Sequence, residues 1–479
     1  MQKKEKRSND ADDSNNGNES ANDKCKNSHQ DMKIESTITG IFKRFFDMEP
    51  TSLLIRGLPG TGKSTLALEL VNMLHERYNC FYISTRVSFA KLQRYYPWVI
   101  GFLNDNSLLS YADVKNSTID LRLGSASGTM ELVLDIITNK KNSLIVLDSW
   151  DSLVNHTSIE ERIKMEKTMI TIADTHDALI VFVSEEPELN TTTYLVDGIV
   201  TLSTEYYNGA RIRKMNIDKM RGVMIDRHTH IYTLQEARFI VLQNYEKFNR
   251  LRTVRDDTEN IYKESMSNDS SKDNDSIYTW YNELDYLISD LFRNRNSLLL
   301  EIDPSIEESM LLSTLAGMMM KNILQGNKIL VGSSIDGMLS RITDYTCMIQ
   351  TNATDNILLE NGKGIVVSDT ETLLSRYDEM NRTRRSSGSN SDDIFLVVDD
   401  SILSDREYTI NIMNRIKSDD NKLVMLSYMG VEERLVKGLS DIHIGFYMVE
   451  DTPLLHITKP SMGLFGISDG LRYPLVRVV

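Results

Sequence analysis

The stretch Gly57-Leu-Pro-Gly-Thr-Gly-Lys-Ser-Thr65 decides the fold of the first half of this 479-residue chain. The apolar run Ser52–Ile55 precedes it, and Leu66–Leu74, with apolar residues at helical spacing, follows it. The stretch fits the pattern G-x-x-x-x-G-K-[ST] between a buried strand and a helix, where backbone N–H groups and the helix N-terminus surround phosphate oxygens. An ordinary glycine-rich turn is the alternative, but every fixed position of the pattern matches. We therefore expect a nucleoside triphosphate at this loop.

The loop and one later carboxylate make up the predicted site. The predicted nucleotide-binding residues are Gly57, Gly60, Thr61, Gly62, Lys63, Ser64 and Thr65. In this pattern the lysine reaches the β- and γ-phosphates and the serine hydroxyl binds Mg²⁺. Asp148 ends the apolar run Ser143–Leu147, so its carboxylate is expected to hold the hydration shell of the ion. The sequence thus predicts ATP and Mg²⁺, with Ser64 and Asp148 on the metal side.

Composition limits the class of protein. Hydrophobic residues make up 41 % and charged residues 26 % of the chain, as in ordinary globular proteins. The formal net charge of −15 argues against a general polyanion binder, although charges nearly balance within residues 36–250. The cysteines (Cys25, Cys80 and Cys347) lack metal-ligand spacing. No apolar run is long enough to span a bilayer and no apolar signal segment begins the chain, so we expect a cytoplasmic protein without membrane association.

We predict four segments along the chain. Residues 1–33 are rich in Lys, Asp, Asn, Ser and Glu and are expected to be a disordered, solubilising tail, with a partner-binding arm as the alternative. Residues 34–250 alternate strands and helices and end in antiparallel strands, which is typical of an α/β P-loop domain. Residues 251–276 are predicted to be a polar linker. Residues 277–479 repeat the same order of elements and are predicted to form a second α/β domain.

The second domain is expected to lack a phosphate loop. After its first strand, Ser297–Ile302, the turn carries Glu307 and Glu308 and has neither glycine nor lysine. Carboxylates at this place would repel phosphate, so we expect a degenerate domain that acts as a scaffold or interface. Within it, Arg382–Asp393 is predicted to be a solvated polar loop, with a partner-binding or phosphorylation site as the alternative.

Several segments together resemble a known superfamily. They are Gly57–Thr65, Ser143–Asp148, Ser184-Glu185, Leu195–Gly198 and Lys219–Gly222. This set resembles the RecA-like ATPases of the KaiC/RadA type over about residues 36–250. Within that group, Tyr82–Ser88 followed by Tyr96-Pro-Trp98 resembles the archaeal gas-vesicle regulator D (GvpD) family. The resemblance implies a RecA-like P-loop domain that binds ATP and is followed by a further C-terminal region.

The resemblance also implies a role for Lys219 and Arg221. They match the K-x-R pair that, in KaiC-like rings, reaches across a subunit interface to the neighbour's γ-phosphate. A cation supplied in this way offsets the charge that develops during phosphoryl transfer. Together with Lys63 and Asp148 they are the predicted catalytic residues, and they imply a homo-oligomer. The alternative is a basic pair at a sheet edge in solvent.

One departure concerns the residue that orients the attacking water. KaiC-like ATPases carry a pair of glutamates just after the second strand, whereas this chain has Ser84-Thr85-Arg86-Val87. Asp151 and Glu185 are substitutes at other positions. Ser184, at a strand end, either senses the γ-phosphate or simply terminates the strand. ATP binding is therefore better supported than hydrolysis, and a slow ATPase or ATP-responsive switch is expected.

Two functions from different classes follow. The first is a regulatory ATPase that acts as a nucleotide-dependent switch in signalling or transcription through a protein partner. The alternative is a RecA/RadA-like ATPase acting on DNA, which needs basic loops after the strands that end at Asp148 and Ser184. Here those loops, residues 155–161 and 186–191, are acidic or neutral, so nucleic acid is only weakly supported as a partner. A small-molecule P-loop kinase would need an arginine-rich lid, which the sequence lacks.

Overall fold

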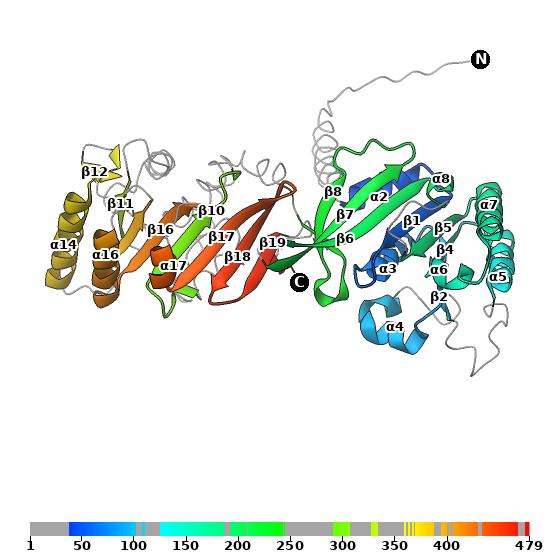
Figure 1. The fold of residues 1–479 in the computed structure, drawn as a ribbon, viewed down its shortest axis with the longest axis horizontal. Coiled ribbons are helices and arrows are strands. Elements are labelled where there is room, and N and C mark those ends of the chain that lie inside the picture. Colours follow the sequence, from blue (N-terminus) through cyan, green and yellow to red (C-terminus); the bar gives the residue numbers. More distant parts are fainter. Residues whose placement is uncertain are drawn as a thin grey trace, which may run out of the picture.

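The computed structural model describes 38–101, 108–110, 125–185, 192–207, 209–242, 244, 291–306, 327–333, 359–360, 363–364, 366–367, 369–387, 394–399, 402, 406–429, 434–467 and 475–478. These residues form two nine-stranded sheets that lie side by side along the long axis of the molecule, and a two-stranded ribbon, β12 (Leu359–Glu360) with β13 (Lys363–Gly364) (Figure 1). Among them, no helix is long and apolar enough to cross a membrane.

The first sheet has the strand order β3-β2-β4-β5-β1-β6-β7-β8-β9. Its strands are β1 (Ser52–Gly57), β2 (Asn79–Ser84), β3 (Leu108–Ser110), β4 (Ser143–Asp148), β5 (Leu179–Ser184), β6 (Gly198–Tyr207), β7 (Ala210–Met220), β8 (Thr229–Thr233) and β9 (Ile240–Val241). The strands β1 to β6 pair in parallel, and β7 to β9 are added antiparallel at one side. The central strands are apolar throughout because helices cover both faces of a parallel sheet.

Helices cover the two faces of this sheet separately. The apolar cluster on one face combines α2 (Ile38–Asp47) and α3 (Lys63–Leu74) with the sheet, and the cluster on the other face combines α5 (Ala126–Asn139), α6 (Trp150–Val154) and α7 (Ile159–Thr175). The shorter helical segments are α4 (Phe89–Tyr95), η1 (Pro97–Gly101), α8 (Thr192–Leu195) and η4 (Gln235–Ala237). This three-layer arrangement confirms the predicted α/β class.

The second sheet has the order β14-β11-β15-β16-β10-β17-β18-β19-β20. Its strands are β10 (Ser297–Ile302), β11 (Lys328–Gly332), β14 (Val366–Val367), β15 (Ile394–Val398), β16 (Lys422–Tyr428), β17 (Ile442–Val449), β18 (Thr452–Lys459), β19 (Gly463–Ile467) and β20 (Leu475–Arg477). Numbered from its own first strand, this order is the same as that of the first sheet. The predicted repetition of a RecA-like architecture is thereby confirmed.

The helices of the second half correct one prediction. The described ones are α14 (Thr370–Ser387), α16 (Arg406–Ser418) and α17 (Arg434–Leu439). The segment from Arg382 was expected to be a loop, but α14 continues to Ser387. Arg384 and Arg385 lie in its last turn, where cations interact favourably with the helix dipole. They donate to Asn421 Oδ1 and Asp419 Oδ1, each at 2.6 Å, so tertiary contacts hold a segment that looked solvated.

Other predictions fall outside the described residues. The tail 1–33, the linker 251–276, and Glu307 and Glu308 are among them. The part of the turn that is described, Asp303–Ile306, is held by its own aspartate, whose Oδ1 accepts from Ser305 N at 2.9 Å.

The two halves also share a polar contact, which we call the Ser–Asp clasp. In the first half, Asp197 Oδ2 accepts from Thr51 N at 3.0 Å, and Ser52 Oγ accepts from Asp197 N at 3.2 Å. In the second half, Asp441 Oδ2 accepts from Ser297 N at 3.2 Å, and Ser297 Oγ accepts from Asp441 N at 3.0 Å. Each clasp joins the start of the first strand to the residue before the strand beside it.

The antiparallel ends of the two sheets meet in the middle of the molecule (Figure 1). An apolar cluster spans the junction; its members include Ile212, Ile231 and Leu242 of the first half and Tyr447, Leu454 and Leu464 of the second. Thr233 Oγ1 donates to Arg477 O at 2.8 Å, and Arg477 N donates to Gln235 Oε1 at 2.8 Å. The segment from β8 to Gln235 therefore belongs to the first sheet and also contacts the last strand of the second.

Candidate nucleotide-binding site

The loop between β1 and α3 has the backbone of a phosphate-binding turn. Gly57 has φ +149° and Gly62 has φ +93°, in the region that favours glycine. A Cβ atom at Gly57 would collide with the carbonyl oxygen of Leu202, and one at Gly62 would lie 2.7 Å from Leu234 Cδ2. Gly62 is the N-cap of α3 and has no side chain to satisfy the first N–H groups of the helix. Those groups remain as donors for an anion.

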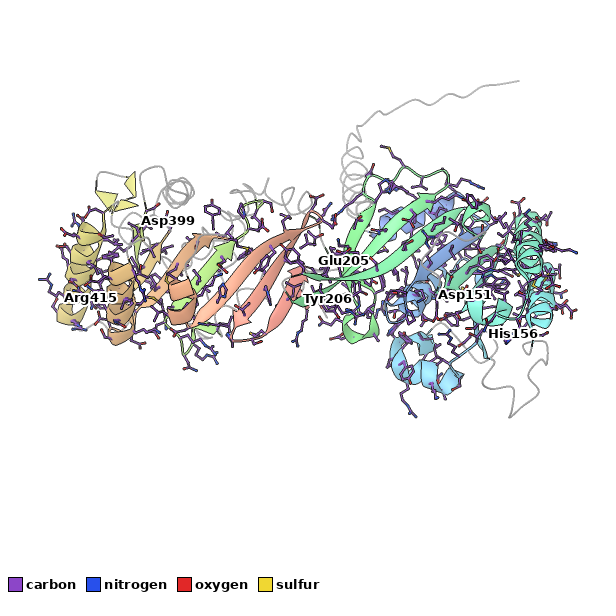
Figure 2. The ribbon with its side chains drawn as sticks, viewed as in Figure 1. Asp151, His156, Glu205, Tyr206, Asp399 and Arg415 are labelled. Atoms are coloured by element: carbon purple, nitrogen blue, oxygen red, sulfur yellow. The ribbon has the colours of Figure 1, made fainter. Side chains whose placement is uncertain are left out.

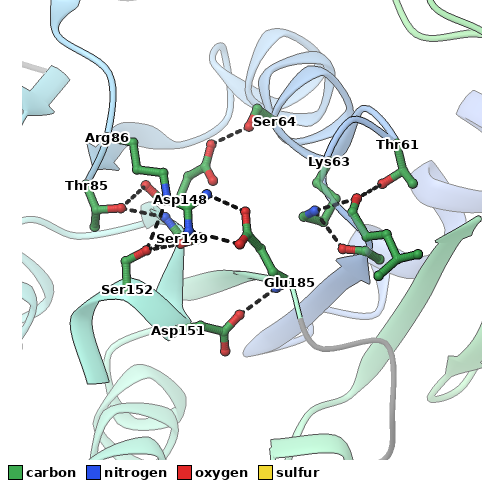
Figure 3. Close-up of polar contacts among 12 residues, drawn as sticks. Thr61, Lys63, Ser64, Thr85, Arg86, Asp148, Ser149, Asp151, Ser152 and Glu185 are labelled. Atoms are coloured by element: carbon green, nitrogen blue, oxygen red, sulfur yellow. Dashed lines mark hydrogen bonds and ion pairs between the residues drawn. The ribbon is translucent and has the colours of Figure 1, made fainter. Parts of the chain in front are cut away.

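Lys63 is folded back onto this loop (Figure 3). Its Nζ donates to Gly57 O at 2.7 Å and to Leu58 O at 3.0 Å, and the residue is only 7 % exposed. Burial lowers the pKa of Lys63, and the nearby Glu185 and Asp148 carboxylates oppose that shift. The ammonium thus occupies a desolvated site whose present partners are neutral carbonyl groups, which phosphate oxygens would replace with charged ones.

Ser64 and Asp148 are in direct contact at the tip of β4. Ser64 Oγ donates to Asp148 Oδ2 at 2.6 Å, and Tyr82 OH donates to the same oxygen at 2.5 Å. Burial and the Asp148 charge raise the pKa of Tyr82 well above its usual range, so this phenol remains a donor. A hydroxyl and a carboxylate are oxygen ligands suited to Mg²⁺, which keeps water and phosphate oxygens as its other ligands. The described residues contain no cluster of three or more His, Cys, Asp or Glu side chains that could hold a metal by itself.

One pocket brings together Asp148 and the predicted loop residues except Gly57 and Thr61, which do not line it. It is lined by Pro59, Gly60, Gly62, Lys63, Ser64, Thr65, Ser84, Arg86, Val87, Tyr96, Asp148, Glu185 and Leu234. Ser184, proposed as a γ-phosphate sensor or a strand terminator, is fully buried and is absent from this lining. The neighbouring Glu185 lines the pocket in its place.

An ion pair crosses the pocket from β2 to β5. Arg86 Nη1 donates a hydrogen bond to Glu185 Oε1, and Arg86 Nη2 donates one to Glu185 Oε2 at 2.9 Å. The Ser152 hydroxyl accepts from Arg86 Nε at 3.2 Å, and Asp151 Oδ2 accepts from Glu185 N at 2.5 Å (Figure 3). The side chains of Arg86 and Glu185 are 54 % and 28 % exposed, so the pair is open to solvent and to a ligand.

Lys219 and Arg221 do not line this pocket. Lys219 Nζ donates to Val196 O at 2.5 Å, and Arg221 Nη1 donates to Asp197 Oδ1 at 2.6 Å. By the strand registers, Lys459 is the second-half counterpart of Lys219, and its Nζ donates to Ser440 O at 3.3 Å. Within one chain both predicted finger residues therefore bind the segment before β6. Their role at a neighbouring subunit's nucleotide stays a prediction.

Two contacts of the loop and one buried cation near it were not predicted from the sequence. Tyr232 OH, on β8, donates to Thr61 O, and Leu234 packs against Gly62. Arg213 on β7 pairs in register with Tyr232, is 7 % exposed, and has no hydrogen-bond partner for Nε and Nη1. The alternation Arg211-Ile-Arg213 could have predicted the cation near the loop, because alternate residues of a strand lie on the same face.

Comparisons with known proteins agree with this geometry. Residues 40–247 match the family model described as "ATPase: KaiC". Together with the α/β fold and the contact between the loop and Asp148, this match shows that residues 40–247 are similar to KaiC-type ATPases of the RecA-like class.

Two GvpD proteins of Halobacterium salinarum are similar to the chain. Protein GvpD1 is 24 % identical over 271 residues, which is 53 % of this chain and 48 % of that protein. Protein GvpD2 is 28 % identical over 209 residues, or 41 % and 42 % of the two chains. The chain thus matches less than half the length of either relative. The expected resemblance to KaiC and GvpD proteins is confirmed.

Proposed function

We propose that this protein is an ATP-binding switch, with slow hydrolysis, whose P-loop domain conveys its nucleotide state to the second domain. The single observation that carries this is the position of the segment from β8 to Gln235. It contacts the phosphate loop at one face and the last strand of the second sheet at the other. A change in the loop therefore has a direct structural route to the second half.

The route consists of consecutive residues. Tyr232 OH and the Leu234 side chain contact Thr61 and Gly62, so both lie against the part of the loop that would surround phosphates. Between them, Thr233 donates to the carbonyl of Arg477, and Gln235 accepts from the same residue's N–H. Successive side chains of a strand point to opposite faces, which explains how one short segment contacts both partners.

ATP with Mg²⁺ is the proposed ligand. Lys63 would hold the β- and γ-phosphates, and Ser64 and Asp148 would provide oxygen for the ion. The geometry that supports this is the 2.6 Å contact between Ser64 and Asp148, beside a lysine that has only carbonyl partners.

The proposed output is regulatory and runs through protein partners. The resemblance to the GvpD family supports a role in regulation, and the acidic net charge of −15 makes nucleic acid a poor partner. We also propose self-association, with Lys219 or Arg221 facing a neighbour's nucleotide. Turnover per subunit that stays constant on dilution and survives Arg221→Ala would remove this part of the proposal.

Hydrogen exchange, measured with mass spectrometry on the full chain, tests the switch. With ATP·Mg²⁺ in place of ADP, exchange is expected to change in peptides covering 229–242 and 475–478 as well as in the loop. Lys63→Ala, which removes the phosphate contact, should abolish both changes. If calorimetry shows ATP bound while exchange at 475–478 is the same in both nucleotides, the coupling is absent and the switch is refuted.

A further inference from the structure

We infer that Glu185 is the carboxylate that orients and deprotonates the attacking water, and that Arg86 moves from Glu185 to the γ-phosphate when ATP binds. This inference rests on the proposed ATP site and assigns its hydrolytic residues. It explains how the chain replaces the acid that is missing after β2, where Thr85 and Arg86 stand.

Sheet order brings the two residues together across 99 positions of sequence. Strands β2 and β5 flank β4, whose last residue is Asp148. The carboxyl ends of parallel strands meet at one edge of a sheet, which is where such folds bind ligands. Arg86 and Glu185 therefore lie on either side of Asp148 and line the same pocket as Lys63 (Figure 3).

Glu185 has the strongest electrostatic effect of any carboxylate on the Lys63 ammonium, ahead of Asp148 and Asp151. The ammonium marks the place of the β- and γ-phosphates, and Glu185 lines the same pocket, so this acid lies within the expected phosphate site. Asp148 is already engaged by Ser64 and Tyr82 through one oxygen. Glu185 lies in the same pocket, and once Arg86 turns to the γ-phosphate both of its oxygens are open to water.

Asp151 supports Glu185 and does not replace it. One of its oxygens accepts from Glu185 N at 2.5 Å, and the other lies 3.3 Å from Arg162 Nη2. Asp151 is also absent from the pocket lining. With both oxygens occupied away from the ligand, it is a positioning residue for the backbone of Glu185.

In the proposed hydrolysis, water is the only reactant besides ATP. In the ion pair of this structure, the Arg86 fork binds both Glu185 oxygens. A γ-phosphate carries more charge than a carboxylate and offers the same bidentate geometry, so it competes for the guanidinium. The released carboxylate accepts the proton of a water whose oxygen forms a bond to the γ-phosphorus. The bond from that phosphorus to the bridging oxygen breaks, ADP leaves with the electron pair, and the proton passes from Glu185 to solvent.

Paired binding and turnover measurements on the full chain test the assignment. Glu185→Gln should lower kcat at least about 100-fold, since it removes the proton acceptor, and should not weaken ATP binding, since it also weakens the ion pair that competes with the γ-phosphate for Arg86. Arg86→Ala should lower kcat at least about 100-fold and also reduce the ratio of ATP to ADP affinity, because a cation on the γ-phosphate is lost. Arg86→Lys should restore part of that ratio. Glu76→Gln and Arg94→Ala, exposed residues outside the site, are the matched controls.

The outcomes separate this inference from the proposed function. Failure of the wild-type chain to bind ATP refutes the function itself. ATP binding without turnover, or turnover that survives Glu185→Gln, refutes the catalytic role of Glu185 alone. If Arg86→Ala lowers thermal stability but leaves the ratio of ATP to ADP affinity unchanged, the ion pair only braces the tips of β2 and β5, and the role of Arg86 is refuted.

Discussion

The two halves of the molecule have the same strand order but differ at the edge where a nucleotide would bind. In the first half, Ser64 of the glycine-rich loop contacts Asp148. In the second half, Ser333 Oγ donates to Asp399, the counterpart of Asp148, and the sequence after β10 has no glycine-rich loop. Figure 2 shows Asp151, in α6 just after β4, and Asp399, just after β15, in the two separate halves. Contacts that both halves share are thus candidates for stabilising the fold, and contacts in one half alone are candidates for function.

The two predicted finger residues, Lys219 and Arg221, differ in whether the second half has a counterpart. Lys219 has a counterpart, Lys459, that binds the equivalent carbonyl in a half without the loop. Its contact within one chain is therefore explained by folding. Arg221 has no basic counterpart, because Ser461 stands two residues after Lys459. The difference leaves Arg221 as the better candidate for a role between subunits.

The largest expected effect is the loss of ATP binding when the phosphate loop, which only the first half carries, is changed. Lys63→Ala should weaken ATP binding at least about 1000-fold, or about 4 kcal/mol, since the loop loses its only side-chain cation. Isothermal titration measures it, with Lys91→Ala on the exposed face of α4 as control. Unchanged ATP affinity in Lys63→Ala would remove the site assignment.

A second pair of variants tests what the halves share. Asp197→Ala and Asp441→Ala each leave strand-entry N–H groups without their acceptor, so each should lower the free energy of unfolding by about 3 kcal/mol. Denaturant unfolding, followed for each half by exchange, should show the loss in the half that carries the change. A negligible loss in either half would mean that the clasp does not stabilise that sheet.

Acid should affect the two halves at different pH. Burial and the nearby Arg227 charge lower the pKa of His230 to about 4, against an ordinary value of 6.5. Below pH 6.5 the unfolded chain binds a proton there that the folded chain does not, so stability falls by about 3 kcal/mol between pH 6.5 and 4. In the second half, burial opposes the shift, but hydrogen bonds from Lys417 and Ser297 lower the pKa of Asp441 overall. Its contribution is present above pH 3.8 and is lost only below that value.

The measurement is unfolding at several pH values in wild-type protein and in His230→Gln, which keeps a donor for the Arg227 carbonyl. The variant should lose the extra pH dependence between 6.5 and 4. A slope identical to that of wild type would show that His230 is not the titrating group.

The smallest effect concerns the paired lysines. Lys219→Met should lower the free energy of unfolding by about 1 kcal/mol, the net value of one hydrogen bond, and Lys459→Met should lower it by more, because Lys459 Nζ also donates to the carbonyls of Lys437 and Gly438; urea unfolding measures both. A loss of stability in Lys219→Met with ATP turnover unchanged is expected if the contact serves only the fold. A loss of turnover in Lys219→Met without a matching loss of stability would instead restore its predicted role across a subunit interface.

The loop, Asp148 and the repeated order of strands were predictable because each is a local pattern: glycine spacing, an apolar run and its terminal acid. The pairing of Arg86 with Glu185 was not, since it depends on β2 and β5 becoming neighbours of β4. The contact of Tyr232 with Thr61 likewise depends on where an antiparallel strand is added to the sheet. The prediction of a solvated loop at Arg384 and Arg385 was wrong because their partners, Asn421 and Asp419, lie after the next strand and could not be paired with them from the sequence.

The Ser–Asp clasp bears on the history of the chain. It joins Ser52 to Asp197 and Ser297 to Asp441, so the partners are separated by 145 residues in one half and 144 in the other. A polar contact of this kind is not required by the strand order. Its recurrence at nearly constant spacing is what a tandem duplication would leave behind, with one copy keeping the phosphate loop and the other free to lose it. The ancestor would then have been a single domain whose clasp predates the division of labour between the halves.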